Sequence, residues 1–362
     1  MGLNRRTFIK NTGLLLGYSM LPYSNLYSST SQKPLGVCLV GLGYYSTDLL
    51  APALQLTKHC KLTGIVTGSP WKIPKWQKRY GILDKNVYNY QNMNRIADNP
   101  DIDVIYIVLP TGLHAKYAIK AAQTGKHVWC EKPMARTTSE CQAIIDACTK
   151  NKVKLSIGYR MQHEPNTQQI IKWANTQPYG KIKTITAEAG YYDSRSDHWK
   201  QNKALGGGAM YDMGVYPLNA TRYVTGEEPI AVLKAEHTTK RPKIYTEVDE
   251  TTHFTLEFPS GAIAKCKTSF GAGMNTLRVD CQNGSYGLRP FQAYGGIRGK
   301  ASDGVLLNHS IPNQQAKQMD DDALAIINNT SVLVPGEEGM KDIRIVEAIY
   351  QAASSGEKIV LQ

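Results

Sequence analysis

The stretch "LGVCLVGLGYYS" at residues 35–46 decides the fold that the following residues adopt. Its first half is an apolar run with the length of a buried strand, and glycines end the run. Helical spacing follows at residues 46–57, and a second apolar strand follows at residues 61–68. Strand, glycine turn, helix and strand form a βαβ unit, which predicts two parallel strands joined by a helix.

The same alternation continues to about residue 160. Strands and helices alternate over residues 103–110, 113–125, 127–133, 139–151 and 154–160. A succession of βαβ units predicts a doubly wound parallel sheet. We therefore assign residues 32–157 to a Rossmann domain of the α/β class.

The pattern changes after residue 160, where the strands become longer and apolar residues alternate with polar ones. Such strands are expected at residues 181–192, 231–239, 249–258 and 261–270, and helices near 165–176, 206–225, 315–328 and 341–354. Half-alternating strands are typical of an antiparallel sheet with one face in solvent. We predict an α+β domain with an open, largely antiparallel sheet for residues 158–362. A chain of 362 residues is long enough for two such domains.

Composition excludes several classes of function. The 42 basic and 30 acidic residues give a net charge of +12, but the basic residues are scattered, so we expect no nucleic-acid binding. The seven cysteines lie mostly in apolar runs without short paired spacing, which predicts buried free thiols. No Cys or His spacing matches a zinc site and no acidic loop matches a calcium site, so we expect no metal.

The first residues resemble an export signal. "NRRTFIK" at residues 4–10 is followed by a modest apolar run that is too short to span a membrane. This arrangement resembles a twin-arginine signal, which is read by a machinery that exports folded proteins. We interpret residues 1–31 as this signal and a short arm, and expect a periplasmic protein with no stable membrane insertion after signal removal. A surface amphipathic helix is the alternative.

The glycine turn predicts a dinucleotide site. Gly41, Gly43 and Ser46 occupy the three fingerprint positions between strand and helix, where unpaired N–H groups can bind a pyrophosphate. The next strand ends at Thr67, and Lys72 follows where an acidic residue would bind the ribose of NAD. Hydroxyls and an ammonium favour the 2′-phosphate of NADP, so NAD is the less favoured cofactor. An ordinary βα turn and a solvated Lys72 are the alternatives.

Two later segments contain the residues suited to chemistry. "TGKHVWCEKPMA" at residues 124–135 places Glu131 and Lys132 at the carboxyl end of a buried strand, where ligands bind in open α/β sheets. "GGGAMYDMGVYPL" at residues 206–218 places Asp212 and Tyr216 four residues apart, on one face of a helix. A surface Glu–Lys pair is the alternative for the first segment, and Cys130 is expected to be a buried thiol.

Together these segments resemble the glucose-fructose oxidoreductase, inositol dehydrogenase and rhizopine-catabolism (Gfo/Idh/MocA) superfamily. Within it, the chain is most similar to the glucose-fructose oxidoreductase branch. The resemblance extends from residue 35 to the C-terminus and includes "LPTGLHAKYAIKAAQTGKHVWCEKPMA", "IGYR" and "GGGAMYDMGVYPLNATRYVTGEEPI". It implies that Lys132 lies beside the reacting carbon, that Asp212 orients a sugar and that Tyr216 handles its proton. Many relatives have histidine where this chain has Tyr216, whereas the glucose-fructose branch is similar in having tyrosine.

The resemblance also implies the residues that contact cofactor and substrate. The cofactor residues are Gly41, Gly43, Tyr44, Tyr45, Thr67, Lys72, Leu109, Pro110, His114, Glu131, Lys132, Arg160 and Trp199. The substrate residues are Lys132, Tyr159, Arg160, Asp212 and Tyr216. Core aromatics and surface cations are the alternative for Tyr159, Arg160, Trp199 and Lys200. Relatives have histidine at position 162, where this chain has glutamine, and that shift argues against a catalytic role for His163.

From these points we expect a periplasmic NADP-dependent sugar oxidoreductase. It would oxidise an aldose at C1 to a lactone and reduce a second sugar with the same bound cofactor, because an exported enzyme has no dissolved NADPH pool. The resemblance also implies a homodimer or homotetramer, formed by the second domain. A glycosidase or lyase with a transient oxidation and a non-catalytic sugar-binding protein are the alternatives.

Overall fold

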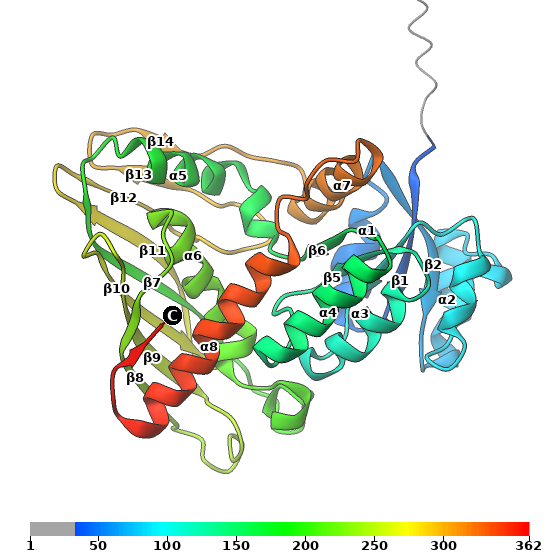
Figure 1. The fold of residues 1–362 in the computed structure, drawn as a ribbon, viewed down its shortest axis with the longest axis horizontal. Coiled ribbons are helices and arrows are strands. Elements are labelled where there is room, and N and C mark those ends of the chain that lie inside the picture. The colour runs from blue at the N-terminus through cyan, green and yellow to red at the C-terminus, as the bar shows by residue number, and fades with distance from the viewer. Residues whose placement is uncertain (1–32, 362) are drawn as a thin grey trace, which may run out of the picture. The chain divides into compact units, whose positions relative to one another are not determined.

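The computed structural model describes residues 33–361, and the predicted export signal lies outside them. A six-stranded sheet comes first along the chain (Figure 1). All its neighbouring strands are parallel, in the order β3-β2-β1-β4-β5-β6. The strands are β1 (Leu35–Val40), β2 (Cys60–Val66), β3 (Val87–Tyr88), β4 (Val104–Ile107), β5 (His127–Cys130) and β6 (Leu155–Ile157). The predicted doubly wound sheet is confirmed.

Strand β1 shows why the first sheet forms. Val37 and Leu39 lie in one hydrophobic cluster and Cys38 and Val40 in another, so helices cover both faces of the strand. A strand buried on both faces must be apolar throughout, as residues 35–40 are. The helices that follow the strands are α1 (Ala51–Ala53), α2 (Ile73–Tyr80), α3 (His114–Ala122) and α4 (Thr138–Lys150).

The second sheet has nine strands in the order β14-β13-β12-β11-β7-β10-β9-β8-β15. Only β7 and β10 pair in parallel among the neighbours of this sheet, so the predicted largely antiparallel sheet is confirmed. Burial alternates along β9 and β10, as expected for strands with one face in solvent. The strands are β7 (Ile182–Tyr192), β8 (Ala231–Thr238), β9 (Thr251–Glu257), β10 (Ile263–Ser269), β11 (Gly271–Cys281), β12 (Ser285–Leu288), β13 (Gly299–Ala301), β14 (Leu306–Leu307) and β15 (Ile359–Val360). The sequence patterns did not predict β3 or the strands β11 to β15.

Helices α5 (Pro165–Thr176), α6 (Val215–Thr225) and α8 (Gly336–Ser355) lie over the second sheet (Figure 1). Helix α7 (Gln314–Ile327) comes after β14 in the chain but packs on the first sheet. Its Met319 lies in the same hydrophobic cluster as Val37, and its Asp320 accepts hydrogen bonds from the backbone N–H of Lys58 (2.9 Å) and His59 (2.8 Å). Residues from the end of the chain therefore complete the first sheet's core.

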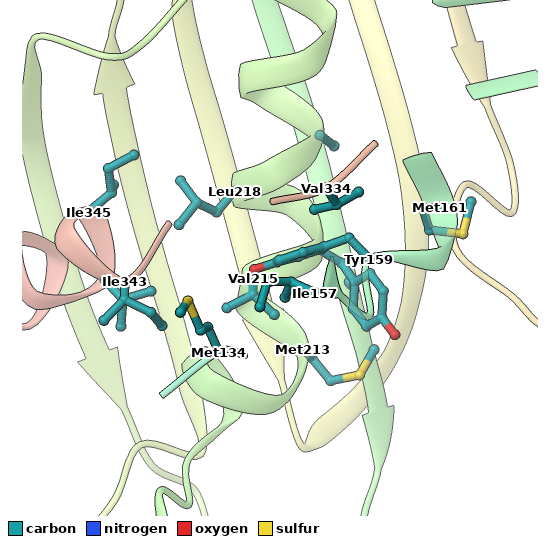
Figure 2. Packing of buried hydrophobic residues seen from close by; sticks show 14 of the residues in the cluster. Met134, Ile157, Tyr159, Met161, Met213, Val215, Leu218, Val334, Ile343 and Ile345 are labelled. Atoms are coloured by element: carbon teal, nitrogen blue, oxygen red, sulfur yellow. The ribbon is translucent and has the colours of Figure 1, made fainter. Parts of the chain in front are cut away.

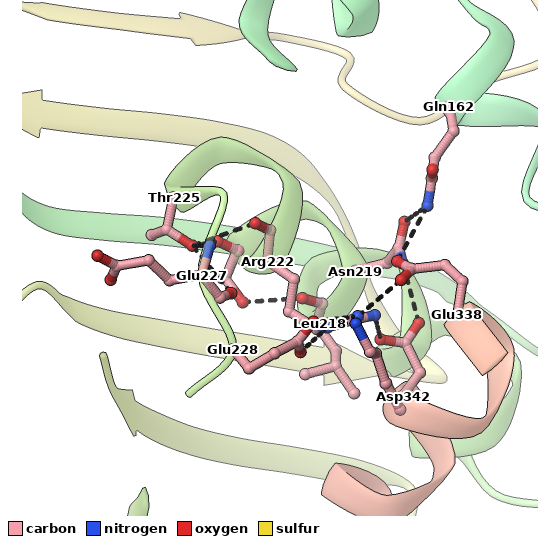
Figure 3. A network of polar contacts seen from close by, with 11 residues as sticks. Gln162, Leu218, Asn219, Arg222, Thr225, Glu227, Glu228, Glu338 and Asp342 are labelled. Atoms are coloured by element: carbon pink, nitrogen blue, oxygen red, sulfur yellow. Dashed lines mark hydrogen bonds and ion pairs between the residues drawn. The ribbon is translucent and has the colours of Figure 1, made fainter. Parts of the chain in front are cut away.

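A buried polar network joins α6 to α8 (Figure 3). The Arg222 guanidinium pairs with Asp342 at 2.6 Å, Glu338 at 2.9 Å and Glu228 at 2.7 Å. Three carboxylates satisfy three donor positions of one buried guanidinium, which a guanidinium's fixed fork geometry allows. The network holds α6 in place, and α6 includes Tyr216.

Two predicted helices differ from the structure. Residues 46–57 form only a short helical segment, η1 (Tyr45–Leu50), with α1 after it. In the predicted helix 206–225, the glycine triplet precedes the helix, which begins as a π-helical segment, η9 (Met210–Gly214), before α6. Pro217 lies just after η9 inside this helix, and it has no N–H to donate to the preceding turn. Within residues 33–361 no helix is long and apolar enough to cross a membrane.

Candidate active site

The glycine turn after β1 has room for a ligand beside Gly43. Gly41 has φ of +94°, and a Cβ there would lie 2.4 Å from the Val108 carbonyl oxygen, so this position requires glycine. A Cβ on Gly43 would meet no atom of residues 33–361 within 4 Å, so packing within this part of the chain does not require glycine there. Ser46 donates a hydrogen bond to the Gly41 carbonyl at 2.5 Å, which closes the turn. The turn fits the close backbone approach that a dinucleotide's pyrophosphate needs.

Lys72 lies against this turn. Its Nζ donates to the Leu42 carbonyl oxygen at 2.7 Å, so the ammonium is not free in solvent. Thr67 is buried at the end of β2, and its hydroxyl accepts a hydrogen bond from the Ser69 N–H at 3.0 Å. These contacts place a cation beside the glycine turn and a hydroxyl at the end of β2.

Strands β5 and β6 are neighbours, so the residues after them meet at one edge of the first sheet. Glu131 follows β5 and is buried, which raises the pKa of its carboxyl even though Tyr106 donates a hydrogen bond to it at 2.7 Å. A Cβ on Gly158, after β6, would lie 2.8 Å from this carboxyl, so a glycine leaves the room that Glu131 occupies. The Lys132–Pro133 peptide bond is cis.

The predicted catalytic residues meet, although they come from distant segments. Lys132 Nζ donates to the main-chain carbonyl oxygen of Asp212 at 2.7 Å and lies 4.4 Å from the ring centroid of Tyr216. The ammonium faces the aromatic ring, in the arrangement of a cation–π contact. Segment η9 therefore holds Lys132 by its backbone, and α6 presents Tyr216 beside it.

Arg160 lies on the other side of the Tyr216 phenol. The side chain is buried at 2% exposure, and its Nη1 donates to the Tyr216 hydroxyl oxygen at 2.8 Å. A guanidinium can only donate, so the phenol oxygen accepts this bond and its own hydrogen must point elsewhere. Arg160 therefore orients the Tyr216 hydroxyl.

The carboxylate of Asp212 has its own partners. Its Oδ2 lies 2.6 Å from Lys200 Nζ and 3.3 Å from the Tyr191 hydroxyl. Burial by itself would raise the pKa of Asp212, but the charges of Lys200 and Lys132 outweigh it and leave the pKa below its ordinary value. Asp212 is an ionised acceptor at neutral pH rather than a proton donor.

Sequence reasoning missed Tyr294, which lies in the loop between β12 and β13. Its ring contacts Tyr45 of the glycine turn at 6.1 Å between centroids, and the Arg160 guanidinium lies 4.8 Å from its centroid. The Tyr294 side chain is 47% exposed, so one part of it packs in this cluster while another part faces solvent. No local pattern marks a tyrosine in such a loop, because only tertiary packing brings it to the glycine turn.

Other predicted residues lie in different surroundings. Tyr159 is buried at 1% exposure, and Figure 2 shows its ring among core side chains such as Met161 and Met213. Both ring nitrogens of His114 face backbone carbonyls, Pro133 O at 2.9 Å and Leu109 O at 2.7 Å, so this side chain braces the two strand-end loops. His163 contacts Asp321 at 2.9 Å.

The remaining predicted residues lie at the edges of this cluster. Tyr44 is 66% exposed, and Trp199 lies beside the Lys200 ammonium at 5.7 Å from the ring centroid. All seven cysteines are buried free thiols, as predicted, and burial raises the pKa of Cys130 well above its ordinary value. Among residues 33–361 no group of three or more His, Cys, Asp or Glu side chains is arranged to hold a metal ion.

Comparisons with known proteins agree with this geometry. A family model described as an oxidoreductase family with an NAD-binding Rossmann fold matches residues 35–159, and a GFO/IDH/MocA C-terminal domain model matches residues 167–287. The crystal structure of an aldose-aldose oxidoreductase from Caulobacter crescentus, complexed with glycerol, is 37% identical with a TM-score of 0.88. The aligned region covers 91% of this chain and 100% of the Caulobacter crescentus chain.

Two curated proteins extend the comparison. A D-xylose 1-dehydrogenase [NADP(+)] from Haloarcula marismortui is 25% identical over 90% of this chain and 93% of its own length. A D-glucoside 3-dehydrogenase from Escherichia coli is 24% identical over 92% of this chain and 99% of its own length. Both alignments span the two sheets rather than the first alone.

Proposed function

The chain belongs to the Gfo/Idh/MocA oxidoreductase family, and we propose that it oxidises an aldose at C1 and reduces a second sugar with the same bound cofactor. It is an NAD(P)-dependent oxidoreductase that acts on sugars. The observation that supports the finer proposal is the placement of the Tyr216 phenol between the cations of Lys132 and Arg160. The aldose-aldose oxidoreductase from Caulobacter crescentus is the similar solved structure that supports a sugar in each half-reaction.

The chain's own residues would bind the cofactor and move the proton. Gly41, Gly43 and Lys72 would hold the phosphates, and the nicotinamide, when bound, supplies the two-electron acceptor that the sugar carbon needs. Tyr216, which faces two cations, would take the proton of the C1 hydroxyl, and Asp212 would accept a hydrogen bond from a sugar hydroxyl.

The second half-reaction reverses these steps on another sugar. Tyr216 would return its proton to the carbonyl oxygen of the acceptor while the carbonyl carbon is reduced. The first sugar loses two hydrogens and the second gains them, so the pair of reactions balances without a dissolved cofactor.

We propose NADP as the cofactor and the periplasm as the location. Lys72 and the absence of an acid at Thr67 and Ser69 support NADP, as does the NADP(+) specificity in the name of the Haloarcula marismortui relative. The paired arginines Arg5 and Arg6 and the apolar run after them support export of a folded, loaded protein.

The test follows the fluorescence of reduced nicotinamide in the purified protein while a panel of aldoses and ketoses is added. We expect the fluorescence to rise with one sugar and fall with another, and mass spectrometry of the denatured protein to identify NADP. A protein that binds sugars but releases no nicotinamide on denaturation would contradict the proposal. Release of an aglycone without net redox change would instead support elimination chemistry.

A Tyr216→Phe variant tests the proton's acceptor. Loss of the phenol oxygen should lower kcat by a factor on the order of 10²–10⁴, the usual contribution of a general acid–base group. Cofactor content should stay at the wild-type level, because the phenol oxygen contacts Arg160 rather than the glycine turn. An unchanged kcat would contradict the role assigned to Tyr216.

A further inference from the structure

Two lysines bind Asp212 at different atoms. Lys132 binds the main-chain carbonyl oxygen at 2.7 Å, whereas Lys200 binds the side-chain oxygen Oδ2 at 2.6 Å. The carboxylate that would contact a sugar is therefore controlled by Lys200 and not by Lys132. Lys200 comes from the helical turn η7 (Trp199–Gln201), in the segment between β7 and the glycine triplet.

The Lys200 ammonium has a defined place. Its side chain is only 18% exposed, and its Nζ lies 3.0 Å from the Tyr191 hydroxyl. Three aromatic rings surround it, with centroids at 5.3 Å for Tyr191, 5.7 Å for Trp199 and 5.9 Å for Phe270. Aromatic faces attract a cation, and the Tyr191 hydroxyl also accepts a hydrogen bond from the same ammonium that binds Asp212. The rings thus fix an ammonium that would otherwise sample many rotamers.

The two oxygens of the Asp212 carboxylate differ as a result. Oδ2 accepts from Lys200 and lies 3.3 Å from the Tyr191 hydroxyl. Among the hydrogen bonds within residues 33–361, none of those assigned to Asp212 ends on Oδ1. A carboxylate with one oxygen held by a cation has a fixed plane, so the other oxygen keeps a fixed direction.

We infer that Lys200 is a positioning and specificity residue that locks Oδ2 of Asp212, so that Oδ1 is presented to a hydroxyl of the sugar. The inference rests on the proposed function, because it assigns the sugar to Asp212. It also separates two roles in the cluster: Asp212 is a fixed anionic acceptor, and Tyr216 alone exchanges the proton. Lys200 acts through Asp212 and need not touch the substrate.

Several other charged or titratable groups face Asp212. They come from the end of β5, from β7, from the segment after β7 and from the loop after β12. These groups are Lys132, Tyr191, Arg195, His198 and Tyr294. Only Lys200 and Tyr191 hydrogen-bond the carboxylate among the residues that the structure describes, so removing Lys200 removes its nearest charge.

The test compares Lys200→Met, which keeps the length of the side chain without its charge, with Lys200→Arg. The matched control is Lys203→Met, three residues along in the same segment, where the lysine side chain is exposed. In Lys200→Met we expect KM for the oxidised sugar to rise roughly ten- to hundredfold, because a hydrogen bond to a charged group contributes on this scale. We expect kcat to change much less, Lys200→Arg to recover part of the loss, and the control to match wild type.

The pH profile separates positioning from simple damage to the fold. Without Lys200, burial would raise the pKa of Asp212, so the acid limb of kcat/KM should move to higher pH in Lys200→Met. A substitution that only lowers the amount of folded enzyme would reduce kcat/KM by the same factor at every pH and would leave the acid limb at its wild-type pH. An unchanged KM together with an unmoved acid limb would overturn the inference.

A structural measurement keeps the inference testable if the proposed reaction fails. Should wild type oxidise no sugar in the panel, the proposed function is wrong, and crystal structures of wild type and Lys200→Met then decide the inference. A carboxylate of Asp212 that turns away from its wild-type plane in the variant supports the locking role. A carboxylate that keeps its plane without Lys200 overturns it.

Discussion

Arg160 is the residue whose surroundings most need a functional explanation. It is a buried cation that forms no ion pair with a carboxylate among residues 33–361. Its guanidinium contacts the Tyr216 hydroxyl and the rings of Tyr216 and Tyr294, while its Nε has no hydrogen-bond partner among the residues that the structure describes. Burying an incompletely satisfied cation costs stability, so the arrangement is better explained by chemistry at Tyr216 than by folding.

Replacing Tyr294 tests its part in this arrangement. Tyr294→Ala removes one aromatic face from Arg160, and contacts of this kind contribute about 0.5–2 kcal/mol. We expect kcat/KM for the sugar to fall by roughly two- to thirtyfold, since each 1.4 kcal/mol is a factor of ten. Tyr294→Phe should retain most activity, because it keeps the ring. Tyr192→Ala is the control, since that exposed ring faces Arg241 instead. Equal losses in Tyr294→Ala and the control would contradict the assignment.

At the scale of elements, helix α7 shows how the end of the chain supports the first sheet. Ser156 of β6 donates a hydrogen bond at 2.7 Å to Asp322 of α7, and the other carboxyl oxygen of Asp322 is buried with no hydrogen-bond partner in the described part of the chain. Asp320 on the same helix binds the backbone N–H groups of Lys58 and His59, which precede β2. Helix α7 therefore docks through specific polar contacts as well as through Met319 in the hydrophobic cluster.

Asp322 predicts a dependence of stability on pH. Burial is the main cause that raises the pKa of Asp322 from 3.8 to about 6. Between these values the folded state binds a proton that the unfolded chain does not, so the free energy of unfolding falls as pH rises. At neutral pH the ionised carboxyl costs about 3 kcal/mol, since one pKa unit corresponds to 1.36 kcal/mol.

The isosteric variant Asp322→Asn removes this titration. Its stability relative to wild type should increase as pH rises through the window from 3.8 to about 6. Urea unfolding of both proteins across this range measures the difference, and Asp98→Asn, at an exposed position, is the control. Parallel stability curves for wild type and Asp322→Asn would show that Asp322 does not titrate as assigned.

At the scale of the whole molecule, the second sheet has a polar face that its helices leave open. Lys234, Glu236, His253 and Lys265 lie exposed on β8, β9 and β10, around a cavity of about 350 Å³. Mixed charges on such a face suit a symmetric contact, where each patch meets its own copy. We propose that two or four chains associate through this face.

Association is checked by sedimentation of the purified protein over a dilution series. We expect a mass two or four times that of one chain, and a Thr186→Arg variant on central strand β7 should sediment as a single chain. Thr186 pairs with Arg278 on one side and Lys265 on the other, so a third cation there adds repulsion to the face. A wild-type mass of one chain at every concentration would contradict the proposal, and circular dichroism would show that the variant is folded.

The sequence by itself determined five of the six strands of the first sheet, strands β7 to β10 of the second, the glycine turn and the helices α3, α4, α5, α7 and α8, because period-2 and period-3.6 patterns and end signals are local. It also placed Lys132, Asp212 and Tyr216 in the segments that meet. Only the tertiary structure decided that α7 returns to the first sheet, that β10 pairs in parallel with β7, and that Lys200 and Tyr294 reach the same cluster. These contacts join residues that are far apart in the chain. They depend on tertiary packing and charge pairing, which local sequence spacing does not predict.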